Sequence, residues 1–289
     1  MSLLTQTGIA SLQLCFYGAG SMAEAIARGL INEKLVEPGR ISMLNKQNRE
    51  RLAELHERYG VQTVVQGSSN EAYLQGADII FLAMKPKDAA DAIAAIRPYL
   101  SPKQLIISVI AGLSISSIEY LLGPEAAIVR TMPNTSSTIG LGATGISYSE
   151  SVTPQQKLLT EAIMGSVGIH AVVEESLQQA VTGVSGSGPA YVYYFMEAMI
   201  DAACQLGLAQ EQAKELVVQT VLGAAEMVRS TGEEPAELRR KVTSPNGTTQ
   251  AALEVMAENL FSETIHKAVR RSAERAGELG ETIERSISE

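Results

Sequence analysis

The sequence has 289 residues, which is enough chain for two domains with buried cores. Hydrophobic residues make up 45% and charged residues 19% of it, a composition that excludes wholesale disorder and a coiled-coil rod. The net charge of −9 argues against a protein that binds nucleic acid or anionic membranes, although it leaves room for a local basic pocket.

The first half alternates between β-rich runs and helical patterns. Strands are predicted over 12–17, 41–44, 62–65, 78–84, 105–110, 127–132, 144–149 and 169–174. Helices are predicted over 21–36, 49–59, 70–74, 89–99, 114–122 and 154–164. This alternation indicates βαβ units, and therefore an α/β domain with a doubly wound parallel sheet of the Rossmann type, over residues 1–175.

After about Glu175 no β-rich run remains. Helical patterns cover 189–206, 210–229, 235–242, 249–259 and 261–279, and a Gly/Ser-rich stretch lies near the start of this region. We therefore expect a second, all-α domain over residues 176–289.

Cysteine content and segment lengths bear on compartment and metal binding. Cys15 and Cys204 are too few and too far apart in sequence to indicate a disulfide framework or a zinc site, and we expect no metal centre. No apolar stretch is long enough to span a bilayer, and the first residues lack the basic start and apolar centre of a signal peptide. We expect a cytoplasmic protein that binds a small molecule rather than membrane or nucleic acid.

A glycine-rich motif joins the first predicted strand to the first helix. It reads Gly18-Ala19-Gly20-Ser21-Met22-Ala23, the G-x-G-x-x-A pattern of dinucleotide-binding folds. Gly18 permits the tight turn, Gly20 lets a pyrophosphate approach the backbone, and Ala23 lets the helix pack closely. The N–H groups of the first helical turn then face the phosphates. The alternative is a glycine turn that serves packing alone.

The end of the second strand bears on the choice of cofactor. An Asp or Glu there commonly holds the ribose 2′-OH of NAD, and none is present. Asn45 can donate a hydrogen bond, while Lys46 or Arg49 can supply charge for a 2′-phosphate. We infer NADP(H), with NAD(H) as a second cofactor. The alternative is that Lys46 and Arg49 are solvated surface charges.

Two further strands end at the same carboxyl edge of the predicted sheet. Met84-Lys85-Pro86 follows one and 108–112 ends the next, at the edge where open α/β sheets bind ligands. Lys85 is either a catalytic acid or, as we favour, a solvated lysine whose backbone alone touches the cofactor. Asn70 is favoured as a helix cap rather than a ligand.

The segment 242–249 is the most distinctive in the second half. A Pro-Asn-Gly turn followed by Thr248 and Thr249 presents hydroxyls and free N–H groups at a helix start, which suits a small carboxylate. The alternative is N-capping by either threonine. Segment 185–189 has similar chemistry, with a structural role equally favoured because Pro189 suits a first helical position. No Ser-His-Asp arrangement is present, which fits an imine acceptor that needs no strong base.

These motifs together resemble the pyrroline-5-carboxylate reductase family over nearly the full length. The resemblance rests on residues 18–23, 83–86 and 130–135, on Ser185-Gly186-Ser187-Gly188-Pro189-Ala190-Tyr191, and on Thr243-Ser244-Pro245-Asn246-Gly247-Thr248-Thr249. It departs at Asn246, where many members have Gly, and at Ser136, where a proline is usual.

The resemblance implies a Rossmann domain and a helical domain, residues 176–289, that binds substrate and forms a homodimer, with dimers assembling further. It implies reduction of 1-pyrroline-5-carboxylate to L-proline by NAD(P)H. It also implies a cofactor lining of Asn45, Asn70, Ala83, Met84, Lys85, Pro86, Val109, Ile110 and Ala111.

On the substrate side the resemblance implies that Ser244, Thr248 and Thr249 bind the carboxylate and ring nitrogen. The carboxylate would rest on backbone N–H groups at Gly247–Thr249, and Thr249 is the expected catalytic residue. Glu175 matches a family position that contacts the substrate-site ligand; from sequence alone it would be a surface charge.

Two other functions stay open at this point. One is a related β-hydroxyacid or imine reductase, in which a lysine of the helical domain acts near the nicotinamide; Lys214 and Lys241 are the candidates by residue type. The other is a non-catalytic dimeric scaffold that binds nucleotide, against which the pair Thr248-Thr249 argues.

Overall fold

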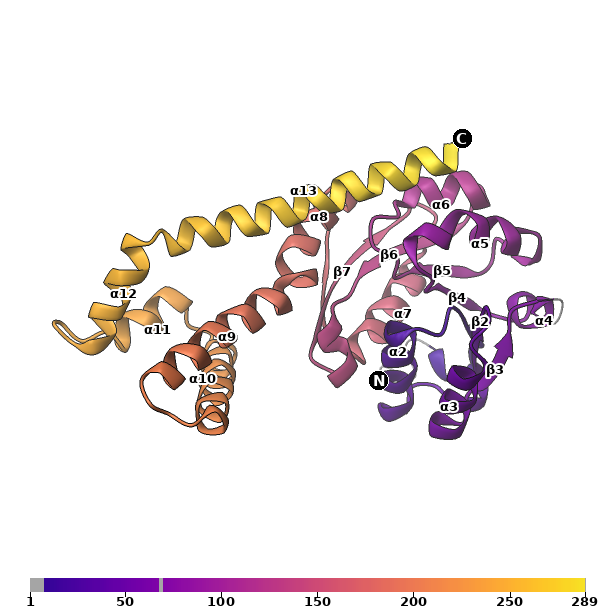
Figure 1. Cartoon of the computed structure of the whole chain (residues 1–289). Helices are drawn as coiled ribbons and strands as arrows, with labels where there is room; N and C mark the ends of the chain where they lie inside the picture. The colour runs from indigo at the N-terminus through magenta and orange to yellow at the C-terminus, as the bar shows by residue number, and fades with distance from the viewer. Residues whose placement is uncertain (1–7, 68–69, 289) are drawn as a thin grey trace. The chain divides into compact units, whose positions relative to one another are not determined.

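The computed structural model describes residues 8–67 and 70–288, which form two compact units. Unit 1 contains the residues up to Ser187 and those from Arg271 onward, and unit 2 is Gly188–Arg270. Figure 1 shows the sheet of unit 1, with strands β2 to β7 labelled. The boundaries between these compact units lie later in the chain than the predicted 175/176. The predicted division into a cofactor domain and a substrate domain therefore stays a prediction.

The sheet of unit 1 has eight strands in the order β3-β2-β1-β4-β5-β6-β7-β8. The order reverses between β1 and β4, which is the topological switch point where doubly wound sheets bind ligands. The strands are β1 Leu14–Tyr17, β2 Ile41–Asn45, β3 Gln62–Val65, β4 Ile79–Leu82, β5 Leu105–Ser108, β6 Ala127–Met132, β7 Gly142–Tyr148 and β8 Gly168–Val172.

All neighbouring strands pair in parallel except β6 and β7, which are antiparallel. The predicted parallel sheet is confirmed, with β6 and β7 as its one antiparallel pair. The segment between Met132 and Gly142 holds only the short 3-10 helix η5, Thr135–Ile139. A parallel crossover needs a dozen or more residues, so this connection can only reverse the chain.

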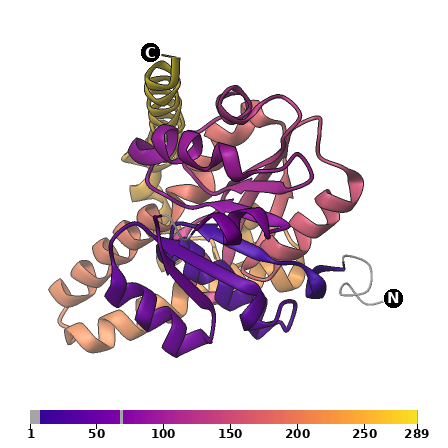
Figure 2. The same ribbon diagram turned by 90° about the vertical axis from the view of Figure 1, so that its right-hand side faces the viewer.

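Helices cover both faces of the sheet, as Figures 1 and 2 show. One buried cluster packs α2, α3 and α7 against the sheet, and the other packs α5 and α6 with Ile283 and Ile287 of α13. The doubly wound prediction is confirmed. These helices are α2 Ser21–Asn32, α3 Arg49–Tyr59, α4 Glu71–Gln75, α5 Ala89–Ile96, α6 Ile115–Leu122, α7 Pro154–Gly165 and α8 Gln178–Val181. The other 3-10 helices are η1 Ile9–Ser11, η2 Pro38–Arg40, η3 Pro86–Asp88, η4 Arg97–Tyr99 and η6 Glu175–Leu177.

Local sequence explains where these elements begin and end. The α3 helix starts after Asn48, whose side chain accepts from the Arg51 N–H, and ends at Gly60 with φ 70°. The α7 helix has a capping box between Thr153 and Gln156. Strands β1 and β4 are buried along their whole length, which explains their continuous apolar sequence.

All the regular elements of unit 2 are helices, as predicted. Its helices are α9 Gly188–Gln205, α10 Gln210–Thr231, α11 Pro235–Lys241 and α12 Thr248–Glu258. The last helix, α13 Phe261–Ser288, runs on into unit 1 and extends well past its predicted end at 279. The stretch ahead of α9 was expected to be a Gly/Ser-rich break between elements, but it forms the π-helix η7, Thr182–Gly186.

Candidate dinucleotide site

The first glycine of the motif is fixed by packing. Gly18 has φ +123°, and its N–H donates to the Leu44 carbonyl at 3.0 Å. A Cβ built on Gly18 would lie 2.4 Å from the Ala83 carbonyl oxygen. The turn of residues 18–20, called the glycine turn below, is therefore wedged between the ends of β2 and β4, where only glycine fits.

The second glycine has a different environment. Gly20 is the N-cap of α2 with φ −78°, and a Cβ built on it meets nothing within 4 Å. Ala23, one turn on, is fully buried against the sheet. The open space over Gly20 lies at the N-terminus of α2, next to the first-turn residues Ser21 and Met22, which is where a pyrophosphate binds in this kind of fold.

A cavity of about 550 Å³ lies along this edge of the sheet. It brings together eight of the predicted cofactor residues: Gly18, Ala19, Gly20, Asn45, Lys46, Ala83, Met84 and Lys85. Its lining also includes residues that sequence reasoning missed: Tyr17, Gln66, Lys87, Asp88, Asp91, Ala92 and Ala95. The predicted residues outside this lining are Ser21, Met22, Arg49, Asn70, Pro86, Val109, Ile110 and Ala111.

The residues after β2 are held by a local hydrogen-bonded turn. The Asn45 Oδ1 accepts from the N–H groups of Gln47 and Asn48 at 3.2 and 3.0 Å. This leaves the Asn45 amino group as the part of that side chain that can donate to a ligand. Arg49 is exposed at the start of α3, whereas Arg51 donates from Nε to the Ala19 carbonyl at 3.4 Å. Arg51 was not predicted, because it lies inside α3 and reaches the glycine turn only through its side chain.

Asn70 is buried, but it does not cap α4 with its side chain. Its Oδ1 accepts from the Gly67 N–H at 2.7 Å, and no side-chain cap bond to the helix forms. Asn70 is the N-cap residue of α4, as predicted, but its side-chain amide bridges the preceding loop instead of bonding to the helix.

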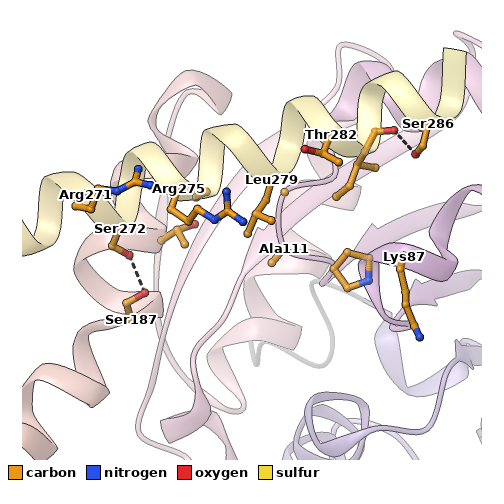
Figure 3. A pocket seen from close by; sticks show the side chains of 14 residues that line it. Lys87, Ala111, Ser187, Arg271, Ser272, Arg275, Leu279, Thr282 and Ser286 are labelled. Atoms are coloured by element: carbon orange, nitrogen blue, oxygen red, sulfur yellow. Dashed lines mark hydrogen bonds between the residues drawn. The ribbon is translucent and has the colours of Figure 1, made fainter.

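A second cavity, of about 750 Å³, opens at the same edge (Figure 3). Pro86 and Ala111, both predicted cofactor residues, line it, and Lys87 lines both cavities. Its other wall is the part of α13 from Arg271 onward, where Ser272 hydrogen-bonds Ser187 at 2.9 Å. No motif in the sequence predicts that α13 lies here. The α13 lining residues are Arg271, Ser272, Arg275, Ala276, Leu279, Thr282, Ile283 and Ser286.

Glu175 has fixed partners within unit 1. Its Oε1 accepts from the Ile115 N–H at 2.7 Å and forms an ion pair with Arg130 at 2.9 Å. The carboxylate therefore sits at the N-terminus of α6, where a negative charge is favourable. Arg130 as its partner was not predicted. Whether Glu175 also contacts substrate stays a prediction.

The threonine segment lies in unit 2. Gly247, not a threonine, is the N-cap of α12, and no side chain bonds to that cap. The alternative in which Thr248 or Thr249 is the cap is therefore wrong. Asn246 has φ 57°, and its N–H donates to the Gln250 Oε1 at 2.8 Å. Ser244 accepts from the Gly247 N–H through its carbonyl at 3.0 Å.

Several other features bear on the alternatives. Lys214 and Lys241 are both exposed, and Lys241 forms an ion pair with Glu233. Among the described residues, no three His, Cys, Asp or Glu side chains gather as a metal site. None of the helices in the described ranges is long and apolar enough to cross a membrane.

The fold and this site define a dinucleotide-binding oxidoreductase built from a Rossmann-type unit and a helical unit. Comparison with known proteins supports this class of protein. Residues 13–112 match a family model described as NADP oxidoreductase coenzyme F420-dependent, and residues 175–279 match pyrroline-5-carboxylate reductase dimerisation.

Full-length relatives narrow the class further. The chain is 43% identical to pyrroline-5-carboxylate reductase 2 of Bacillus subtilis over 266 residues, 92% of this chain and 94% of that protein. The solved pyrroline-5-carboxylate reductase of Coxiella burnetii matches with a TM-score of 0.87 and 39% identity, covering 93% of this chain and 98% of that one. The Plasmodium falciparum enzyme, solved with NADP bound, matches with a TM-score of 0.84 and 33% identity, over 94% of this chain and 100% of that one. The chain belongs to the pyrroline-5-carboxylate reductase family.

Proposed function

We propose that this chain reduces 1-pyrroline-5-carboxylate to L-proline, the last step of proline biosynthesis, with NADPH as the hydride donor and NADH as a second donor. The observation that carries the proposal is the 43% identity to a named pyrroline-5-carboxylate reductase over 92% of the chain. The glycine turn and the open space over Gly20 supply the matching nucleotide chemistry.

The residues present fit a dinucleotide phosphate. The pyrophosphate would approach the backbone at Gly20, where a Cβ has no neighbour, and face the N–H groups of Ser21 and Met22. Asn45 and Lys46 line the same cavity, with no acidic residue between Ile41 and Arg49 to repel a 2′-phosphate. Arg49 stays a predicted phosphate ligand. When bound, the reduced nicotinamide supplies the hydride that reaches the carbon of the substrate C=N bond.

The nicotinamide end of the cofactor is expected farther along the same edge of the sheet. Pro86 and Ala111 line the second cavity beside Lys87, which also lines the first. We assign the nicotinamide end to this second cavity, with the Val109–Ala111 backbone beside it. Asn70, Ala83, Met84 and Lys85 keep their predicted roles along the cofactor.

The substrate would bind at the start of α12. Its carboxylate would accept from the N–H groups of Thr248 and Thr249, which no side chain caps, beside Gly247 and Ser244, which hydrogen-bond each other through their backbones. Thr249 Oγ would hydrogen-bond the ring nitrogen. Threonine is a poor acid, so orientation outweighs acid catalysis here. Well-oriented pairing of donor and acceptor is worth about 7–11 kcal/mol.

The proposal extends to assembly and location. A homodimer is supported by the dimerisation match over residues 175–279 and by exposed side chains in unit 2 such as Tyr194 and Leu222. We further propose that dimers assemble into a larger homo-oligomer and that the enzyme works in the cytoplasm. Light scattering after size-exclusion chromatography tests the oligomeric state, and cell fractionation tests the location in the cytoplasm.

The experiment follows oxidation of NADPH with pyrroline carboxylate as substrate. Thr249→Ala should lower kcat at least tenfold and leave the NADPH Kd unchanged, because it removes the contact to the ring nitrogen alone. Thr249→Ser keeps the hydroxyl and serves as the control. Wild-type kcat in Thr249→Ala would refute the assigned role, and no turnover of any cyclic imine by the wild type would refute the function.

A further inference from the structure

Beside the glycine turn, α2 and α3 are joined by a cluster of charges centred on Arg51. Its Nη1 pairs with Glu54 at 2.9 Å, and its Nη2 pairs closely with Glu24 on α2. Its Nε donates to the carbonyl of Ala19, in the middle of the glycine turn, at 3.4 Å. The side chains of Arg51 and Glu24 are only 20% and 15% exposed, so solvent weakens their ion pair little, whereas Glu54 is 44% exposed.

Arg51 is also tied to the loop that follows β2. The Asn48 N–H donates to the Asn45 Oδ1 at 3.0 Å, and the Arg51 N–H donates to the Asn48 Oδ1 at 2.9 Å. One residue therefore connects, by hydrogen bonds, the loop that carries Asn45 and Lys46 with the turn that would hold the pyrophosphate.

The arrangement fixes what Arg51 can do. Its guanidinium donates to two carboxylates and a carbonyl, so three of its five N–H groups have partners within the protein. Because its Nε already donates to the Ala19 carbonyl, that N–H is not available to a nucleotide phosphate. Hydrogen bonds from a charged donor in a fixed fork are geometrically demanding, which suits them to holding a backbone carbonyl in place.

We infer that Arg51 is a positioning residue that holds the Ala19 carbonyl, and with it the glycine turn, in the conformation that binds the pyrophosphate. The inference rests on the dinucleotide binding of the proposed function. Because both NADPH and NADH carry the pyrophosphate, Arg51 should matter equally for the two, unlike a residue that contacts the 2′-phosphate.

The chain offers a matched control in Arg58. It pairs with the same two carboxylates, Glu24 at 3.0 Å and Glu54 at 2.6 Å, and lies on the same helix. Within the described residues it makes no contact with the glycine turn. Loss of Arg58 therefore removes ion pairs of the same cluster without releasing Ala19.

The experiment compares Arg51→Met and Arg58→Met by calorimetry with NADPH and NADH, in the absence of substrate. We expect Arg51→Met to raise both Kd values about tenfold, leaving their ratio unchanged, and Arg58→Met to change them less than twofold. With pyrroline carboxylate, Arg51→Met should raise the KM for nucleotide and keep kcat at saturation. Lys46→Ala, in contrast, should weaken NADPH alone.

Three outcomes overturn the inference. If Arg51→Met weakens NADPH but not NADH, the residue binds the 2′-phosphate directly. If both variants weaken nucleotide binding equally, the cluster stabilises the fold without acting through Ala19. If neither variant changes either Kd, the contact has no role in binding. Because nucleotide binding is measured without substrate, failure of pyrroline carboxylate turnover leaves this comparison intact.

Discussion

The two glycines of the turn should fail in opposite ways when each is replaced by alanine. In Gly18→Ala the new methyl group would sit 2.4 Å from the Ala83 carbonyl oxygen and 2.6 Å from its carbon, at φ +123°. Both neighbours are backbone atoms of the strand end and cannot rotate aside. Backbone strain of about 1–3 kcal/mol and overpacking of about 1–3 kcal/mol give an expected destabilisation of about 3 kcal/mol. For a unit of this size, that lowers Tm by roughly 6–12 °C.

Gly20→Ala is the matched case with the opposite expectation. Its methyl group meets no atom within 4 Å, and φ is −78°, so the free energy of unfolding should change by less than about 0.5 kcal/mol. The methyl group instead occupies the space the pyrophosphate needs, and the NADPH Kd should rise at least tenfold. Thermal unfolding and calorimetry measure the two effects. A wild-type Tm in Gly18→Ala, or wild-type NADPH binding in Gly20→Ala, would refute the reasoning.

Two further predictions concern α12 and the charge cluster. Asn246 has φ 57°, so Asn246→Gly should leave Tm unchanged or slightly raised, while Asn246→Val should destabilise by about 1–2 kcal/mol; equal Tm values for the two would contradict this. Burial acts to raise the pKa of the Glu24 carboxyl, but hydrogen bonds from Arg51 and Tyr59 outweigh it and lower the pKa below its usual value. The Glu24 carboxylate therefore stabilises the folded state fully at pH values above the pKa that it has in the unfolded chain. This contribution is lost as pH falls through the lower pKa that it has in the folded chain. Urea unfolding from pH 7 to pH 3 should show a smaller loss of stability in Glu24→Gln than in the wild type, and parallel curves would contradict the assignment.

The order of the elements could be predicted because continuous apolar runs identify buried strands. Strands β3 and β6 have the predicted bounds, and α3 ends at Gly60 as expected. The direction of β7 could not be predicted from its own residues, because it depends on the length of the connection from β6. The end of α13 was missed because Gly280 follows the predicted end like a C-cap. In the structure a Cβ on Gly280 would lie 3.0 Å from the Gly112 carbonyl, so this glycine serves close packing inside a continuing helix.

The candidate site shows a similar division between what sequence can and cannot reveal. Motif spacing gathered Gly18, Asn45 and Met84 correctly at one edge, because parallel strands end together. Arg51 escaped because it acts through a backbone carbonyl of another element, and no motif marks such a contact. The partner of Glu175 escaped for the same reason, since Arg130 lies on a strand far away in sequence.

The helical unit shows why sequence patterns alone do not reveal what covers an apolar face. Its helices were predicted from apolar periodicity, yet Ala213 and Val217 are the buried apolar side chains of residues 188–270. Larger side chains there, including Leu206 at 88% and Tyr194 at 75%, remain exposed in the single chain. Periodicity reports that a face is apolar but not whether the same chain or another one covers it. The match of residues 175–279 to a dimerisation model supports the proposal that a second copy covers these apolar side chains.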